Sequence, residues 1–289
     1  MKIKKITVLL AMALLISSAI RSQDNKHEVF FSATGGISSL KYKINEGDNK
    51  LAFGSSVGVG YNYFLSENWA LNTGLELSFM NSKGLMDNIS DEYNAIDANN
   101  DEFRFAYSIH SVEEKQNAIF LNIPLMVQFQ QSVSKGFYAA VGGKIGIPVS
   151  GKYTTTLSNL STTAYYADID LLIDKDNEVN GIGHFAGAEK KADLDMKLSF
   201  MLSAEVGNKW RLTDKLALYS GVYCDYGLND VRKNKEKSSL LGYNKQHPSD
   251  FEVNSITASK YLKAEGTKVL TEKMYPISIG VKLKLAFAY

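Results

Sequence analysis

The chain contains little cysteine, little proline and almost no net charge. Cys224 is the only cysteine in 289 residues, so the fold has no internal disulfide and no cysteine pair for a metal. A net charge of +1 lacks the basic surplus of nucleic-acid-binding domains, and nucleic acid is therefore not an expected partner. Four prolines, against 22 glycines and 11% aromatic residues, favour β-structure with close backbone approach.

Long apolar runs are also scarce. A lysine-rich start is followed by one apolar run, Ile6 to Ile16, and then by small residues, which is the order of a secretory signal peptide. We expect residues 1–22 to be this signal, cleaved after Ser22 or, alternatively, after Ala19, and residues 23–289 to form one domain. No later run approaches the length of a membrane helix, so any membrane span must be made of strands.

The last fifteen residues show the pattern most clearly. From Ile277 to Phe287 every odd position is large and apolar, while the even positions are Ser278, Gly280, Lys282, Lys284 and Ala286. A period of two predicts a β-strand with two unlike faces. The aromatic residue at the end of the chain suits a strand that ends at a membrane interface.

Seven earlier segments have the same alternation, which makes eight in all. They cover residues 28–42, 51–65, 69–81, 118–130, 137–149, 196–208, 216–228 and 275–289. Short turns alternate with three long polar stretches at 82–117, 150–195 and 229–274. An even number of strands with alternating short and long connections predicts an all-β, eight-stranded antiparallel up-and-down transmembrane β-barrel with three long extracellular loops.

A soluble barrel would show the same period with its apolar face turned inward. The second face favours the membrane alternative, because it is mostly Gly, Ser, Ala and Asn, which suit the narrow interior of an eight-stranded barrel. A few charged residues share that face and should form one hydrogen-bonded ionic network in the lumen: Glu76, Lys144, Glu205, Asp225, Lys282 and Lys284. A gate or proton path is one interpretation of this network, and a polar core that holds the barrel closed is the favoured one.

Pro124 conflicts with the strand around it, since proline removes a ladder donor, and we expect a β-bulge there. The segment from Phe120 to Val127 contains the pattern Leu-x-Ile-Pro-Leu. Together with the glycine-rich strand Gly54 to Tyr63 and the terminal strand Val281 to Phe287, it resembles the PorT-like outer-membrane β-barrel domain family of Bacteroidetes. This resemblance implies the barrel fold and a link to secretion or gliding machinery.

Two features of the polar stretches suggest chemistry. His110 or His184 could act as the base of a hydrolase at the barrel rim, but no spacing points to a nucleophile, and solvated histidines are the better interpretation. Acidic residues between Asp168 and Glu178 could hold a divalent cation that bridges to lipopolysaccharide phosphates, or could simply keep the loop solvated. We predict no resident cofactor and no metal site.

Aromatic residues near the strand ends are expected to form interfacial girdles, among them Trp69, Tyr61, Tyr63, Phe137, Trp210, Tyr275 and Tyr289. The leading hypothesis is a non-enzymatic outer-membrane barrel whose loops meet other molecules. The expected partners are outer-membrane lipid and lipopolysaccharide, together with other envelope or secretion proteins. A small channel or an accessory subunit of a secretion or uptake machine is the second hypothesis, and a rim hydrolase is the third.

Overall fold

The computed structural model describes residues 26–131, 135–175, 180–233, 238–262 and 269–288. The predicted signal peptide, residues 1–22, lies outside this part of the chain. Almost all regular structure in the described ranges is β-strand. No helix among these residues has the length and apolar character needed to cross a membrane.

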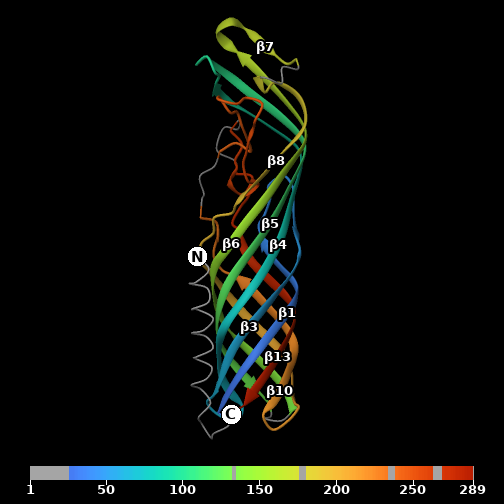
Figure 1. The fold of residues 1–289 in the computed structure, drawn as a ribbon, viewed down its shortest axis with the longest axis vertical. Helices are drawn as coiled ribbons and strands as arrows, with labels where there is room; N and C mark the ends of the chain where they lie inside the picture. The colour runs from blue at the N-terminus through green and yellow to red at the C-terminus, as the bar shows by residue number, and fades with distance from the viewer. Residues whose placement is uncertain (1–25, 132–134, 176–179, 234–237, 263–268, 289) are drawn as a thin grey trace, which may run out of the picture.

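Among the described residues, eight strands form a closed antiparallel ring (Figure 1). Around the ring they follow the order β4 (Trp69–Ile96), β3 (Phe53–Phe64), β1 (His27–Lys41), β13 (Tyr275–Ala288), β10 (Leu216–Gly227), β9 (Ser199–Arg211), β6 (Lys135–Tyr166) and β5 (Glu102–Gln130), which pairs with β4 again. The first and last strands are neighbours, with Ala33 opposite Leu283. The predicted eight-stranded up-and-down barrel is confirmed, and this closure removes every free edge from the ring.

Large apolar side chains cover the outside of the ring. Phe53, Val141 and Val281 are 71%, 64% and 60% exposed, and the closing strand alternates between exposed and buried residues as predicted. A continuous apolar surface of this kind is unfavourable in water and suits contact with lipid. We call this surface the apolar belt. At the end of the belt with short turns, Trp69 packs edge-on against Phe129, with 5.2 Å between ring centroids.

Two of the three stretches predicted as long loops are mostly strand. Residues 82–117 contain the continuations of β4 and β5, which reverse between Ile96 and Glu102. Residues 150–195 contain the continuation of β6, the short helix η1 (Ala167–Ile169), β7 (Leu171–Ile173) and β8 (Gly183–Asp193), which pairs with β6. The prediction of loops there was wrong, and Figure 1 shows these strands rising well past the rest of the barrel. We call this projecting part the outer sheet.

The outer sheet was missed because its strands change parity partway along. Even-numbered residues of β4 face inward up to Met86, whereas odd-numbered ones do so from Ile89. At the change, Asn88 has a φ of 54°, and Asn159 on β6 has a φ of 51°. A left-handed residue inside a strand interrupts the alternation of side chains, so a strict period of two cannot be followed through it.

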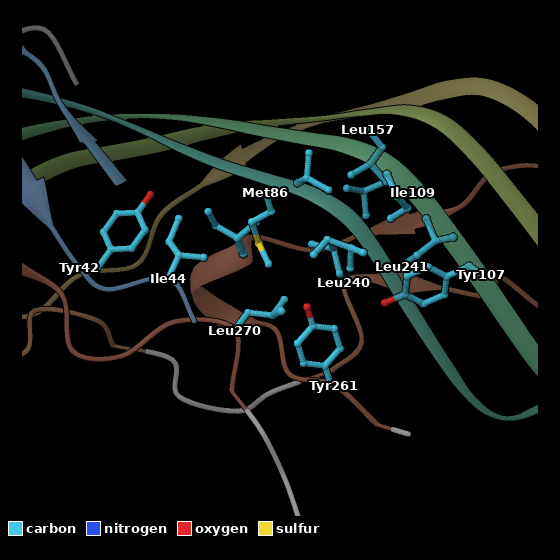
Figure 2. Packing of buried hydrophobic residues seen from close by; sticks show 14 of the residues in the cluster. Tyr42, Ile44, Met86, Tyr107, Ile109, Leu157, Leu240, Leu241, Tyr261 and Leu270 are labelled. Atoms are coloured by element: carbon cyan, nitrogen blue, oxygen red, sulfur yellow. The ribbon is translucent and has the colours of Figure 1, made fainter. Parts of the chain in front are cut away.

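The described parts of the third long stretch, residues 229–233, 238–262 and 269–274, fold against the inner face of the outer sheet. They contain β11 (Leu241–Gly242), β12 (Glu252–Val253) and the short helix η3 (Ile256–Ala258), and we call them the cap. Figure 2 shows Leu240 and Leu270 of the cap packed close to Met86 of β4. The short strand β2 (Asp48–Leu51) pairs antiparallel with residues 82–85 of β4. The cap and the outer sheet therefore enclose a second hydrophobic core beyond the barrel.

The expected bulge at Pro124 was wrong. Pro124 lies opposite Lys144 in regular register, and the shift between β5 and β6 occurs between Ile119 and Phe120. On the other side of β5, pairing with β4 lapses between Thr73 and Glu76 without any change of register. The missing proline donor therefore leaves a gap in one ladder, which does not require an extra residue.

We predict that Leu240→Ala loosens the second core and spares the barrel. Leu240 is fully buried, and truncating such a residue costs about 2–5 kcal/mol. Amide hydrogen exchange should accelerate at Phe105 and Tyr107, which pack in the same cluster, and stay slow at Tyr138 inside the barrel. Faster exchange at all three residues would show that the two cores unfold as one unit.

Candidate functional site

The six charged residues predicted to share the lumen are buried side by side. Glu76 is on β4, Lys144 on β6, Glu205 on β9 and Asp225 on β10, while Lys282 and Lys284 are both on β13. Each side chain is at most 5% exposed. Strand closure is what brings them together, since these positions are spread over more than 200 residues of sequence.

Every charge in this network has an opposite charge as its neighbour. The Lys144 Nζ atom lies 2.8 Å from Asp225 Oδ2 and 3.2 Å from Glu76 Oε1. Lys282 Nζ lies 3.6 Å from Glu76 Oε2 and also pairs with Glu205. Lys284 pairs with Glu205 as well. Three carboxylates face three ammonium groups, so the network is neutral overall and offers no net charge to attract an ion.

Polar and aromatic side chains hold the network in place. Ser203 donates a hydrogen bond of 2.5 Å to Asp225, and Ser78 donates one of 3.2 Å to Glu76. The Lys284 ammonium lies over the rings of Phe30 and Tyr138, at 5.3 Å and 5.4 Å from their centroids. Such contacts restrict each charged group to one position, which favours a packed plug over a mobile gate.

A second buried ion pair, which the sequence pattern did not reveal, lies nearer the short-turn end. Lys209 Nζ lies 2.8 Å from Glu28 Oε1, and Tyr219 and Asn62 donate hydrogen bonds to Glu28 Oε2. Parity could have found this pair. Glu28 is an even-numbered residue of the first predicted strand, whose even-numbered residues face inward. Lys209 is odd-numbered, like the inward-facing Glu205 on the same strand, but it lies one residue beyond the predicted end of that strand.

The lumen is open at the short-turn end only as far as this second pair. A cavity of about 530 Å³ is lined there by residues that include Lys26, Glu28, Lys209 and Lys215. Beyond it, the buried rings of Tyr138 and Tyr219 meet edge to face, with centroids 5.1 Å apart. These rings lie between the Glu28–Lys209 pair and the network around Lys284, so the cavity is a vestibule at one end of the barrel.

At the opposite end, Glu114 joins the barrel wall to the cap. It is fully buried on β5 and accepts hydrogen bonds from Thr155, Gln116, the Ser255 hydroxyl and the backbone amide of Ile256. The donor–acceptor distances are 2.6 to 2.8 Å. Burial raises the pKa of Glu114, which lies beyond the apolar belt, although all four donors favour its charged form.

Comparison with known proteins places the chain in a family. The model of the outer membrane protein beta-barrel domain matches residues 21–233, which is more than half of the chain. The chain belongs to that family. The barrel therefore lies in the bacterial outer membrane. No curated protein matches the chain.

Solved structures of other outer-membrane proteins are similar to most of this chain. Neisserial surface protein A is 8% identical, with 91% of this chain and 97% of that one covered and a TM-score of 0.34. OprG of Pseudomonas aeruginosa is 10% identical, with coverage of 91% and 96% and a TM-score of 0.31. A major outer membrane protein of Thermus thermophilus is 10% identical, with coverage of 91% and 99% and a TM-score of 0.35.

Family membership gives the barrel its orientation. Outer-membrane barrels have short turns on the periplasmic side and longer connections outside the cell. The vestibule of this barrel domain then opens toward the periplasm, and the outer sheet and cap lie outside the cell.

The remaining residues with candidate chemistry are dispersed. His110 Nδ1 lies 3.2 Å from Asn88 Oδ1, and His184 Nδ1 lies 2.7 Å from Ser161 Oγ, and both pairs are exposed. No group of ligands that could hold a metal ion occurs among the described residues. The predicted acidic run is only partly described, since residues 176–179 lie outside the described ranges. Cys224 is exposed on the apolar belt.

We predict that Glu205→Gln destabilises the barrel strongly. The substitution removes the carboxylate that pairs with both Lys282 and Lys284, and Glu76 then remains as a partner for Lys282 alone. Breaking a buried ion pair costs about 3–5 kcal/mol. Urea unfolding in detergent micelles measures this loss. Glu189→Gln is the matched control because Glu189 pairs with Lys191 on the exposed surface, and its midpoint should not move. Equal midpoints for both variants would contradict a structural role for the network.

We also predict a pH dependence that comes from Glu114. Because its folded pKa is raised above the ordinary value of 4.5, the folded state holds the proton more tightly than the unfolded state. The contribution of Glu114 to stability is therefore greatest below pH 4.5 and is lost as the pH rises through its folded pKa. Exchange rates of cap amides, compared between wild type and Glu114→Gln across this range, isolate the effect. Parallel pH curves for the two proteins would contradict it.

Proposed function

We propose that this protein is a non-conducting, non-enzymatic barrel that anchors an interaction platform on the outside of the cell. The observation that carries the proposal is the filled lumen. The neutral ion-paired network and the Tyr138–Tyr219 layer occupy the barrel, and the cap packs over its outer end. With the interior occupied by the chain's own side chains, the surface that remains for function is the outer sheet with its cap.

The tip of the outer sheet has the surface expected of a contact region. Ile169, Leu171 and Leu172 are 68%, 44% and 56% exposed, and they lie on η1 and β7, at the far end of the molecule from the short turns (Figure 1). Ile96, in the neighbouring β4–β5 hairpin, is 47% exposed. These residues stand apart from the apolar belt, so lipid contact does not account for them.

An accessory role in a secretion or uptake machine is the second candidate. The vestibule of about 530 Å³ favours it, because it opens toward the periplasm and is lined by both charged and apolar residues. The resemblance to PorT-like barrels also points to envelope machinery. On this alternative the working surface would be the periplasmic end, and the outer sheet would have no partner.

We expect the purified protein to show no steady ion conductance in a planar lipid bilayer. The packed rings of Tyr138 and Tyr219 and the paired charges behind them occupy the lumen at two successive levels. A steady current through the wild-type protein would contradict the proposed closure, and Tyr138→Ala should raise the conductance if the ring layer is what blocks the lumen.

Site-specific photocrosslinking in intact cells tests the interaction platform. A crosslinker at Leu172 should give a discrete adduct, whereas one at Asn94, which is exposed on β4 but polar, should give none. A crosslinker at Lys215 in the vestibule tests the second candidate. A discrete adduct from Lys215 together with none from Leu172 would replace the first proposal by the second.

A further inference from the structure

Three basic residues at the mouth of the vestibule belong to the inner face of the barrel. Lys26 and Lys215 lie one residue before β1 and β10 and have the inward parity of those strands. Arg211 ends β9 and has the inward parity of that strand. All three line the cavity of about 530 Å³, so contact with lipid headgroups does not account for them. We call these three residues the inner basic cluster.

The inner basic cluster is not balanced by carboxylates that face the cavity. Arg211 pairs with Asp214 at 3.3 Å, but the Asp214 side chain is fully exposed, so water screens this pair. Within the described ranges, Lys26 and Lys215 have no carboxylate at ion-pair distance. Glu67, in the turn after β3, also lines the cavity and is exposed. The mouth of the vestibule therefore has positive charge that an external anion would neutralise.

The floor of the vestibule also favours an anion over a cation. Glu28 Oε1 accepts a hydrogen bond from Lys209 at 2.8 Å, and Glu28 Oε2 accepts from Tyr219 at 2.8 Å and Asn62 at 3.1 Å. Both carboxylate oxygens are therefore already engaged. Lys209 donates to Glu28 and, at 3.1 Å, to Gln130 Oε1, which uses two of the three N–H donors of its ammonium group. A ligand on this floor meets an available donor rather than an available carboxylate.

Apolar side chains make up much of the remaining lining. Phe64 of β3, Leu216 and Ala217 of β10 and Ala286 of β13 all contribute to it. The cavity volume of about 530 Å³ lies within the range of roughly 300–1,000 Å³ that is typical of small-molecule sites. Inorganic phosphate would fill only a small part of this space and would leave the apolar walls in contact with water. The lining therefore fits an anion that has an apolar body.

We propose that the vestibule binds a small organic anion with an apolar body, of the class of aromatic carboxylates. Its anionic groups pair with the inner basic cluster, and its body packs against Phe64 and Leu216. Because the ring layer of Tyr138 and Tyr219 closes the inner end, the ligand enters and leaves through the periplasmic mouth. The inference depends on neither candidate function. Crosslinking at Leu172 and ligand binding in the vestibule are separate measurements, so either proposal can fail without the other.

The test uses the folded full chain in nanodiscs of zwitterionic lipid, which leave the vestibule open to water. The probe is naphthalene-2,6-dicarboxylate, because its two charges keep it out of the bilayer. Isothermal titration calorimetry should show saturable binding. The analogue with two aminomethyl groups, which reverses the charge, and inorganic phosphate, which lacks the apolar body, should each bind about tenfold more weakly. The variant with Lys26→Gln and Lys215→Gln should bind the dicarboxylate about tenfold more weakly than wild type. Both lysines are exposed, so the variant should keep the fold.

A matched control separates the inner basic cluster from net charge. Lys135 lies at the same end of the barrel but outside the vestibule, with its ammonium 4.8 Å from the ring centroid of Trp210. Lys135→Gln combined with Lys152→Gln removes the same charge from exposed positions that do not line the cavity, and binding should not change. Ala288→Phe places a ring in the lining of the cavity and should weaken binding without any change of charge.

Heat-dependent migration on gels confirms that each variant is folded before it is titrated. The proposal would be overturned if wild type showed no saturable binding, or if the charge-reversed analogue or inorganic phosphate bound as tightly as the dicarboxylate. Undiminished binding by the variant of Lys26 and Lys215, or an equal loss in the variant of Lys135 and Lys152, would also overturn it. The same holds if Ala288→Phe binds like wild type.

Discussion

The narrow bore of an eight-stranded ring constrains everything else in this molecule. A ring of this size leaves an interior that side chains fill completely, so each inward position must hold either a small residue or one that packs with the opposite wall. Charged residues can occupy such an interior only in balanced pairs, since an isolated charge there would be very costly. The neutral network around Lys144 and Glu205 meets this condition, and it ties five strands together across the lumen.

Outside the membrane the constraint is different, because water replaces lipid on one face of the sheet. The outer sheet needs a conventional apolar core on its inner face, and the cap supplies the covering layer. Glu114 lies on the barrel wall where the polar lumen ends and the apolar core under the cap begins, and it bonds to the cap residues Ser255 and Ile256. Two of its hydrogen bonds, from Ser255 and Ile256, hold the start of η3 against the barrel wall, so the cap is anchored by one side chain as well as by burial.

A barrel filled in this way directs attention to its surfaces. The structure presents two different ones at opposite ends of a single axis: a periplasmic vestibule and an apolar tip far from the membrane. The long strands β4, β5 and β6 run continuously from the belt to the tip region, so they hold the tip at a defined distance from the apolar belt. Loops of the same length would not do so, because their conformational freedom would let the tip move relative to the membrane.

The sequence alone determined the barrel, the number of its membrane strands and which face of each strand is apolar. An alternation with period two shows which residues share a strand face. The two faces differ chemically because one contacts lipid and the other packs inside a narrow barrel. The sequence did not determine the outer sheet, the cap or the bulge between Ile119 and Phe120, nor did it reveal Glu28 with Lys209. At Asn88 and Asn159 left-handed backbone breaks the alternation, and cap residues such as Leu240 find their core only through contacts distant in sequence. Only the tertiary structure decides such features, because packing across strands, and not local pattern, selects their conformation.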